Sequence, residues 1–309
     1  MPIKTTTVSV MIPTKDRVTD LVITVQTLLR QSVLPEELII VDQSRDPEGR
    51  AQIERLYAEA DDRIRQTLKL IYISDVGLPG SATARNRAME MAQGAVWLFL
   101  DDDVQLEPNF IEELLAVFNR YRKVSGVSGI ITNYRPPAWT SRAWTTFFAH
   151  GPFFDERQPI YWDANRLRES EPIPVRKLGS GLMSFRAEAI RNVRFDENLR
   201  GVPGGEDVDF CMRLKRCSIM VIAPRARLVH KQSPSAREKT FYLRKLVRTA
   251  CYLYWRNWDT DLKNRFFFIW LLAGYVLLAT VSGLKRHSWE PWQSLLQGMR
   301  DARAQLNSN

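Results

Sequence analysis

The sequence predicts an α/β protein in which a mixed, mostly parallel sheet is flanked by helices and followed by a helical, membrane-associated C-terminal segment. Three observations predict this class. Short apolar runs alternate with helical patterns through the N-terminal half, acidic side chains follow those runs, and a basic, aromatic segment ends the chain. Strands that are apolar throughout are typical of a parallel sheet covered by helices on both faces.

Length and composition agree with a globular protein of about two domains. The chain has 309 residues, of which 45% are hydrophobic and 26% charged, and this balance excludes a disordered or fibrous protein. Three cysteines form neither a disulfide framework nor a paired metal motif, which indicates free thiols in a reducing compartment. The polar start and the brief apolar run after it do not resemble a signal peptide.

The expected elements of the N-terminal half follow one another in strand and helix pairs. We expect buried strands at Val8–Pro13 and Leu38–Val41, and further strands at Leu68–Ile73 and Ala95–Leu100. We expect helices at Val18–Arg30, Pro47–Asp61 and Ser81–Ala92. The spacing of apolar residues predicts the first helix. Asp46 as an N-cap and Pro47 in the first turn predict the second.

The middle of the chain has a weaker pattern. Residues 133–176 are rich in proline and aromatic residues and are expected to form a long irregular loop, a kind of segment that is usually functional. Regular structure is expected again at 177–190 and 195–216, including a helix over Asp207–Arg216. A strand at 219–223 and an extended segment at 225–230 follow.

The C-terminal region is basic, aromatic and partly uncharged. Ten basic and four acidic residues lie between Phe241 and Asn309, a net charge of +6 out of +9 for the chain. Residues 239–258 are expected to be helical, and Phe266–Leu284 carries no charge over nearly the ~20 residues that cross a bilayer. The interfacial composition favours a membrane-associated element over a buried core helix, and it leaves open whether the segment spans the membrane or lies on its surface.

Polar side chains follow all four expected N-terminal strands. These residues are Thr14, Asp42, Asp75 and the run Asp101–Asp103. In open α/β sheets, ligands bind beyond the carboxyl ends of the strands, so we expect these side chains to gather. Adjacent carboxylates suit Mg²⁺ or Mn²⁺; the alternative for Asp101–Asp103 is a solvated acidic turn.

Four more residues carry candidate chemistry. Glu206 and Asp207 follow Gly204-Gly205 at a helix start, where an ionised carboxylate serves either as a general base or as a simple cap. His230 lies in an extended segment after a strand. It is a candidate ligand of a metal or a diphosphate, and the alternative is a structural histidine. Arg85 lies near the start of a helix behind the Gly77-Leu-Pro-Gly80 loop, a position that favours an anion site. The chain has neither a Walker loop nor a G-x-G-x-x-G after its first strand.

As an ordered set, these motifs resemble glycosyltransferase family 2, whose members have the GT-A fold. The resemblance covers roughly residues 7–232. The matching strings are VSVMIPTKDR, LIIVDQS, GLPGSATARNRAM, WLFLDDDV, GSGLMSFRAEAI, GGEDVDFCMRL and VIAPRARLVH. One departure is Gln43, which follows Asp42 where relatives often have a second acid, so no nucleotide contact is carried over to position 43.

The resemblance implies an inverting enzyme that moves one sugar from a nucleotide-diphosphate donor to a hydroxyl of a glycan or lipid-linked acceptor. It implies that Mg²⁺ or Mn²⁺ is held by Asp101, Asp103 and His230. It implies that the nucleotide is bound by Thr14, Asp42, Asp75 and Arg85. Asp207 matches the catalytic base, and Glu206 matches an acceptor-binding position.

The expected organisation is a GT-A domain at 1–232, with a nucleotide-sugar half at about 1–104 and an acceptor half at about 105–232. Residues 233–309 would form the membrane-associated region. We expect a role in cell-envelope polysaccharide synthesis at the cytoplasmic face of the membrane, through a peripheral contact or a single span. The alternatives are a nucleotidyltransferase, or a non-enzymatic protein that binds a membrane surface or nucleic acid. The basic excess lies beside an uncharged apolar stretch, which favours lipid over nucleic acid.

Overall fold

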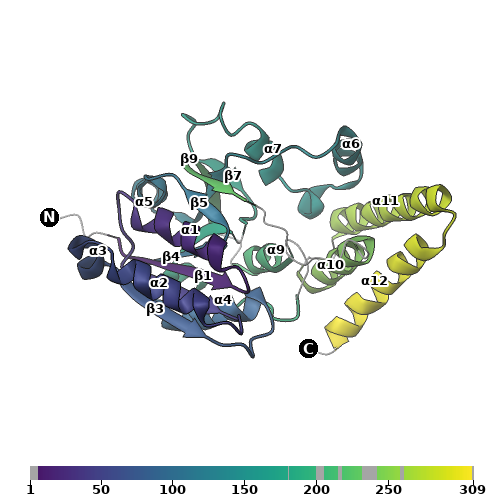
Figure 1. The fold of residues 1–309 in the computed structure, drawn as a ribbon. Helices are drawn as coiled ribbons and strands as arrows, with labels where there is room; N and C mark the ends of the chain where they lie inside the picture. The colour runs from purple at the N-terminus through teal and green to yellow at the C-terminus, as the bar shows by residue number, and fades with distance from the viewer. Residues whose placement is uncertain are drawn as a thin grey trace. The chain divides into compact units, whose positions relative to one another are not determined.

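A computed structural model describes residues 6–179, 181–199, 205–214, 218–231, 242–257 and 261–307. The chain divides into two compact units, Met1–Tyr134 with Arg157–Ser233 and Arg135–Glu156 with Pro234–Asn309 (Figure 1). Gly204, Cys217 and the expected domain boundary at 232/233 lie outside the described residues. The expected helix at 239–258 is described from Tyr242 to Asn257.

The first unit is built on a mixed, mostly parallel sheet, as the sequence predicts. Its strands are β1 (Val8–Thr14), β2 (Glu37–Asp42), β3 (Lys69–Ser74), β4 (Val96–Leu100), β5 (Val104–Leu106), β6 (Val124–Ile131), β7 (Ile173–Val175), β8 (Leu182–Arg186) and β9 (Ile219–His230). Their order is β3-β2-β1-β4-β8-β6-β9-β5, with β7 paired to β9. The first four strands run parallel to one another, whereas β8 is antiparallel to both of its neighbours, β4 and β6.

Helices alternate with the parallel strands. They are α1 (Val18–Leu29), α2 (Glu48–Ala58), α3 (Asp62–Thr67), α4 (Ser81–Met91), α5 (Phe110–Arg120), α7 (Arg157–Trp162), α8 (Ala187–Ile190) and α9 (Gly205–Met212). The expectation of one helix over 47–61 is wrong at its C-terminal end. The Asp61 carboxylate accepts a hydrogen bond from the Ile64 N–H and caps a separate helix, α3. Asp46 is not the N-cap residue of α2, but its carboxylate accepts from the Glu48 N–H at 2.9 Å.

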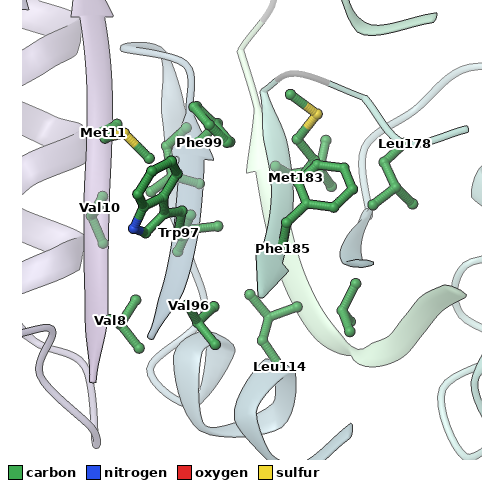
Figure 2. Close-up of a cluster of buried hydrophobic side chains, with 14 of the residues drawn as sticks. Val8, Val10, Met11, Val96, Trp97, Phe99, Leu114, Leu178, Met183 and Phe185 are labelled. Atoms are coloured by element: carbon green, nitrogen blue, oxygen red, sulfur yellow. The ribbon is translucent and has the colours of Figure 1, made fainter. Parts of the chain in front are cut away.

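The core of the first unit includes the part of the sheet where the strands change from parallel to antiparallel. Figure 2 shows side chains of β1, β4 and β8 packed in one cluster, including Met11, Trp97, Phe99, Met183 and Phe185. All residues of β2 and β4 are buried, as expected for strands covered on both faces. The continuous apolar runs therefore located these strands correctly.

The second unit is helical. It contains α6 (Trp139–Phe148), the short 3₁₀ helix η1 (Gly151–Phe153), α10 (Tyr242–Asn257), α11 (Leu262–Arg286) and α12 (Glu290–Asn307). The expectation that residues 133–176 form an irregular loop is wrong, because that stretch holds α6, η1, α7 and β7. Among the described residues, α11 is the helix that is long and apolar enough to cross a membrane by length and composition.

Candidate active site

The carboxyl ends of the parallel strands bring three predicted nucleotide-binding residues to one rim. Thr14 is the register partner of Asp42, and the backbone N–H of Asp75 donates to the carbonyl oxygen of Asp42 at 2.8 Å. The Asp42 carboxylate is buried, and it accepts hydrogen bonds from the Tyr72 hydroxyl at 2.6 Å and from the Ser44 N–H at 2.8 Å. These contacts fix Asp42 firmly, whereas Asp75 is half-buried at the end of the edge strand.

Asp101, Asp103 and His230 form a compact group of candidate metal ligands. One ligand atom from each lies within 4.8 Å of the others, and His230 Nε2 lies 2.9 Å from Asp103 Oδ1 and 3.8 Å from Asp101 Oδ2. Strand pairing explains how the distant histidine arrives, since Val104 of β5 is the antiparallel partner of His230 on β9. Two carboxylate oxygens and an imidazole nitrogen at this spacing fit a divalent cation.

Gly181 leaves room for the Asp101 carboxylate. The backbone N–H of Asp101 donates to the carbonyl of Gly181, at the point where β8 begins beside β4. A Cβ atom at position 181 would collide with Asp101 Oδ2. The glycine is therefore required by the close approach of this carboxylate rather than by its own backbone angles.

Asp102, the middle acid of the run, faces the protein instead of the ligand group. Its carboxylate accepts from the Thr14 hydroxyl at 2.7 Å and from Arg17 Nη1 at 3.0 Å. Burial raises the pKa of Asp102 to about 6, although the Thr14 and Arg17 hydrogen bonds oppose this shift. Thr14, which the sequence analysis assigned to nucleotide binding, is therefore also a hydrogen-bond donor to Asp102.

Arg85 joins the candidate metal group to the start of α9. Its guanidinium, 4% exposed, donates to Asp101 Oδ1 at 3.0 Å and to Glu206 Oε2 at 2.9 Å. Ser81 Oγ also donates to Glu206 Oε2, at 2.8 Å. Burial raises the pKa of Glu206, and the charge of Arg85 opposes that shift. Arg85, which the sequence analysis assigned to an anion site, therefore holds the carboxylates of Asp101 and Glu206 in place.

Asp207 lies on the same side as the metal group. Its Oδ2 accepts from Arg157 Nη1 at 3.3 Å, and both side chains are buried. A Cβ atom at Gly179 would lie 4.0 Å from Asp207 Oδ2, only two positions before the glycine that borders Asp101. The charges of both Asp207 and Asp101 act on Glu206. The predicted base and the predicted metal ligands therefore gather at one rim.

His230 lies in a strongly acidic environment. Burial opposes its protonation, but the hydrogen bond to Asp103 and the charges of Asp101 and Asp103 outweigh burial and raise the pKa of His230. The same negative charges that stabilise an imidazolium would stabilise a bound cation. A proton and a metal would therefore compete for this nitrogen.

Gln43 has a structural role that the sequence did not reveal. Its side-chain amide is buried and donates to the carbonyl oxygens of Leu78 at 2.8 Å and Gly80 at 3.1 Å. These bonds hold the loop of residues 77–80 that precedes α4 and Arg85. A glutamine supplies the donors that this loop needs, and a carboxylate could not.

Two arginines of the candidate site were not identified from the sequence. Arg17 contacts Asp102 and Asp103, and Arg157 contacts Asp207. Arg17 ends the VSVMIPTKDR motif, and its charge close to the end of the first strand was a usable signal. Arg157 lies in the stretch expected to be irregular, and nothing in the sequence around it indicates a partner 50 positions away.

The family model described as "Glycosyl transferase family 2" matches residues 9–187, more than half of the chain. A validoxylamine A glucosyltransferase of Streptomyces hygroscopicus subsp. limoneus is 31% identical over 129 residues, 41% of this chain and 27% of that protein. A putative teichuronic acid biosynthesis glycosyltransferase, TuaG, of Bacillus subtilis is 36% identical over 92 residues, 30% of this chain and 34% of that protein. The matched stretches thus span about a third or less of these relatives.

Solved structures share the fold at low sequence identity. TarS residues 1–349 of S. aureus, in complex with UDP-GlcNAc, align with a TM-score of 0.60 at 15% identity and cover 96% of this chain and 80% of that chain. The mannosyltransferase PcManGT of Pyrobaculum calidifontis, in complex with GDP-Man and Mn²⁺, aligns with a TM-score of 0.56 at 16% identity and covers 96% and 86%. The GT-A expectation for the architecture is confirmed.

Proposed function

The chain belongs to glycosyl transferase family 2, and on that premise we propose that it transfers one sugar from a nucleotide-diphosphate donor to a hydroxyl group, with inversion at the anomeric carbon. The observation that carries the proposal is the rim itself. There Arg85 joins Asp101 of the candidate metal group to Glu206, the neighbour of Asp207. Family membership favours glycosyl transfer over the nucleotidyltransferase alternative.

Asp101, Asp103 and His230 would hold Mg²⁺ or Mn²⁺, and the Mn²⁺ in the complex of PcManGT supports this choice. Such a cation supplies charge neutralisation for the departing diphosphate. Thr14, Asp42, Asp75 and Arg85 would border the nucleotide. The nucleotide sugars bound by the structural neighbours, UDP-GlcNAc and GDP-Man, support a donor of this class.

Asp207 would remove the proton of the acceptor hydroxyl as that oxygen attacks the anomeric carbon. Asp207 lies in the first turn of α9, where the helix dipole favours a carboxylate. Arg157 contacts its Oδ2 and would hold the carboxylate in position, while Glu206 would orient the acceptor. A double displacement needs a second carboxylate free to form a covalent bond with the sugar, whereas Glu206 and Asp101 are both held by Arg85. A single, inverting displacement therefore agrees best with these contacts.

The acceptor that we propose is a glycan or lipid-linked hydroxyl at the cytoplasmic face of a membrane, in the synthesis of a cell-envelope polysaccharide. The teichuronic acid function named for TuaG and the basic, apolar C-terminal region support this class of acceptor.

A two-part experiment tests the proposal. A thermal-shift screen of nucleotide sugars, with and without Mn²⁺, should identify a donor that raises the melting temperature only when the cation is present. NMR of the product formed from that donor should then show an anomeric configuration opposite to that of the donor. Retention of configuration would contradict the single displacement, and release of pyrophosphate would indicate nucleotidyl transfer instead.

A further inference from the structure

An apolar stripe runs along the exposed side of α11 in the second unit. Its large side chains lie three, four or seven positions apart, with one adjacent pair, and this spacing places them on one face of the helix. They are Leu262, Phe266, Ile269, Val276, Leu277 and Leu284. Exposure reaches 83% at Leu262 and 71% at Leu284, so the stripe is open over both ends of the helix. At 1.5 Å per residue it extends over about 33 Å.

Helix α6 continues this surface. Phe147 packs its ring 5.4 Å from that of Trp270 on α11, and Trp270 stacks with Phe266. A shallow hollow of about 390 Å³ lies between the two helices and is lined by Phe147, Phe266 and Trp270 among others. Trp139, at the start of α6, is 78% exposed. We define the docking face as the six stripe residues of α11 together with Trp139 and Phe147.

The opposite side of α11 is committed to the second unit. The Tyr254 ring of α10 stacks on Phe268 at 4.0 Å, and Trp144 of α6 donates its indole N–H to the Gly274 carbonyl at 3.3 Å. A Cβ atom at Gly274 would collide with Phe148, so α6 and α11 pack in close contact. Among the described residues, these contacts cover one side of α11 and leave the stripe on its other side exposed.

The helices behind α11 are charged. Arg244 of α10 forms an ion pair with Asp301 of α12 at 2.6 Å, and Figure 1 shows α10, α11 and α12 lying side by side. If α11 crossed a bilayer, it would have to leave these helices or carry their charges into hydrocarbon, and the second course is strongly unfavourable. The packing thus argues against a transmembrane orientation.

The charges around the docking face match an anionic surface. Lys263 and Arg265 are exposed in the first turn of α11, and Lys285 and Arg286 are exposed in its last turn. No acidic residue occurs from Leu262 to Arg286. Basic side chains beside an apolar face are attracted to anionic lipid headgroups, and exposed tryptophans such as Trp139 favour the membrane interface.

We propose that the docking face binds the surface of an anionic phospholipid bilayer, with α11 lying parallel to the membrane plane and half immersed in the interface. This arrangement buries the stripe, keeps α10 and α12 in water, and brings the basic side chains to the headgroups. The inference uses residues of the second unit alone. Membrane binding can therefore be disproved while sugar transfer is confirmed, and sugar transfer can be disproved while membrane binding is confirmed.

Vesicle co-sedimentation tests the surface and its occupant. The full chain should bind vesicles of phosphatidylcholine mixed with phosphatidylglycerol much more strongly than vesicles of phosphatidylcholine alone. The double variant Ile269→Glu, Leu277→Glu should lose at least about tenfold in partitioning, because apolar area drives interfacial binding. Leu296→Glu, which changes an exposed leucine of α12 outside the docking face, is the matched control and should bind normally. Equal binding by the double variant and the wild type would overturn the proposal.

Depth measurements separate lying on the membrane from crossing it. A fluorophore is attached in turn to Leu262→Cys, Ile269→Cys, Leu277→Cys and Leu284→Cys, with Cys217 replaced by serine, and is quenched by brominated lipids. We expect a similar shallow depth at all four positions. A depth that is greatest near the middle of α11 would establish a span and overturn the proposal. A dimer of the wild type in sedimentation velocity that Ile269→Glu, Leu277→Glu dissociates, without binding to vesicles, would assign the face to a second copy instead.

Discussion

Arg157 and Asp207 meet from two elements that lie 50 positions apart in the sequence. If Arg157 holds the base in position, Arg157→Gln should lower kcat by at least about tenfold while leaving the KM for the donor unchanged, because geometry at the reacting oxygen controls the rate. Arg157→Lys should restore part of the activity.

Arg168→Gln is the matched control, since Arg168 is exposed and lies 3.7 Å from Glu107. Steady-state kinetics with the donor found by the thermal-shift screen measures both parameters. A rise in donor KM with unchanged kcat would assign Arg157 to the nucleotide rather than to the base.

Gly181 provides a second test at the scale of one residue. Gly181→Ala would place a methyl group against Asp101 Oδ2 and displace that carboxylate from Asp103 and His230. We expect the Mn²⁺-dependent rise in melting temperature to disappear, with a normal circular dichroism spectrum. A variant that keeps the full Mn²⁺ effect would show that Asp101 is not a required ligand.

At the scale of elements, the loop before α4 depends on Gln43. Gln43→Ala removes two hydrogen bonds to the carbonyl oxygens of Leu78 and Gly80 and should lower the free energy of unfolding by about 1–3 kcal/mol. Denaturant unfolding measures this loss. Gln52→Ala, which removes an exposed side-chain bond on α2, should change stability much less. Equal losses in the two variants would contradict the structural role of Gln43.

The buried thiols report on the packing of α9 and α10. Burial raises the pKa of Cys211 and of Cys251 from 9.0 to about 12. Because the unfolded chain releases these protons first, the thiols make the native state less stable as pH rises from 9.0 toward 12. At pH 9.0 we expect iodoacetamide to leave both cysteines unmodified in the native protein and to modify both in guanidinium. Peptide mass spectrometry reads each site, and rapid modification of native Cys211 would contradict the packing of α9.

The elements that could be predicted from sequence are those with a strong local signal. β1, β2 and β4 are continuous apolar runs because both faces of the sheet are covered. β5 has three residues and is defined by its pairing with β9, which no local pattern reveals. α6 is rich in threonine and tryptophan, and its helical character depends on packing against α11.

At the scale of the whole molecule, one general rule made most of the candidate site predictable from the sequence: ligands of open α/β sheets bind beyond the carboxyl ends of the strands. Thr14, Asp42 and Asp101–Asp103 gather because parallel strands end at one edge of the sheet. The ion-pair partners of Arg17, Arg85 and Arg157 could not be predicted in this way, because these side chains meet only after folding, although the position of Arg17 beside a strand end was a signal. The roles assigned to these residues stay predictions until activity is measured.

Removal of the metal should affect binding and transfer together. With EDTA present, we expect the donor to lose most of its stabilising effect and transfer to stop, and added Mn²⁺ or Mg²⁺ to restore both. Calorimetric titration of the donor with and without the cation measures the first effect. Full transfer activity in EDTA would contradict the proposed role of Asp101, Asp103 and His230.

The most direct test of the central claim compares donor binding and sugar transfer in Asp207→Asn. Asp62→Asn in exposed α3 is the matched control. With the donor and Mn²⁺ present, Asp207→Asn should bind the donor with nearly wild-type affinity, yet transfer sugar at least about a hundredfold more slowly, because only the proton acceptor is lost. Transfer at the wild-type rate by a folded Asp207→Asn would contradict the account.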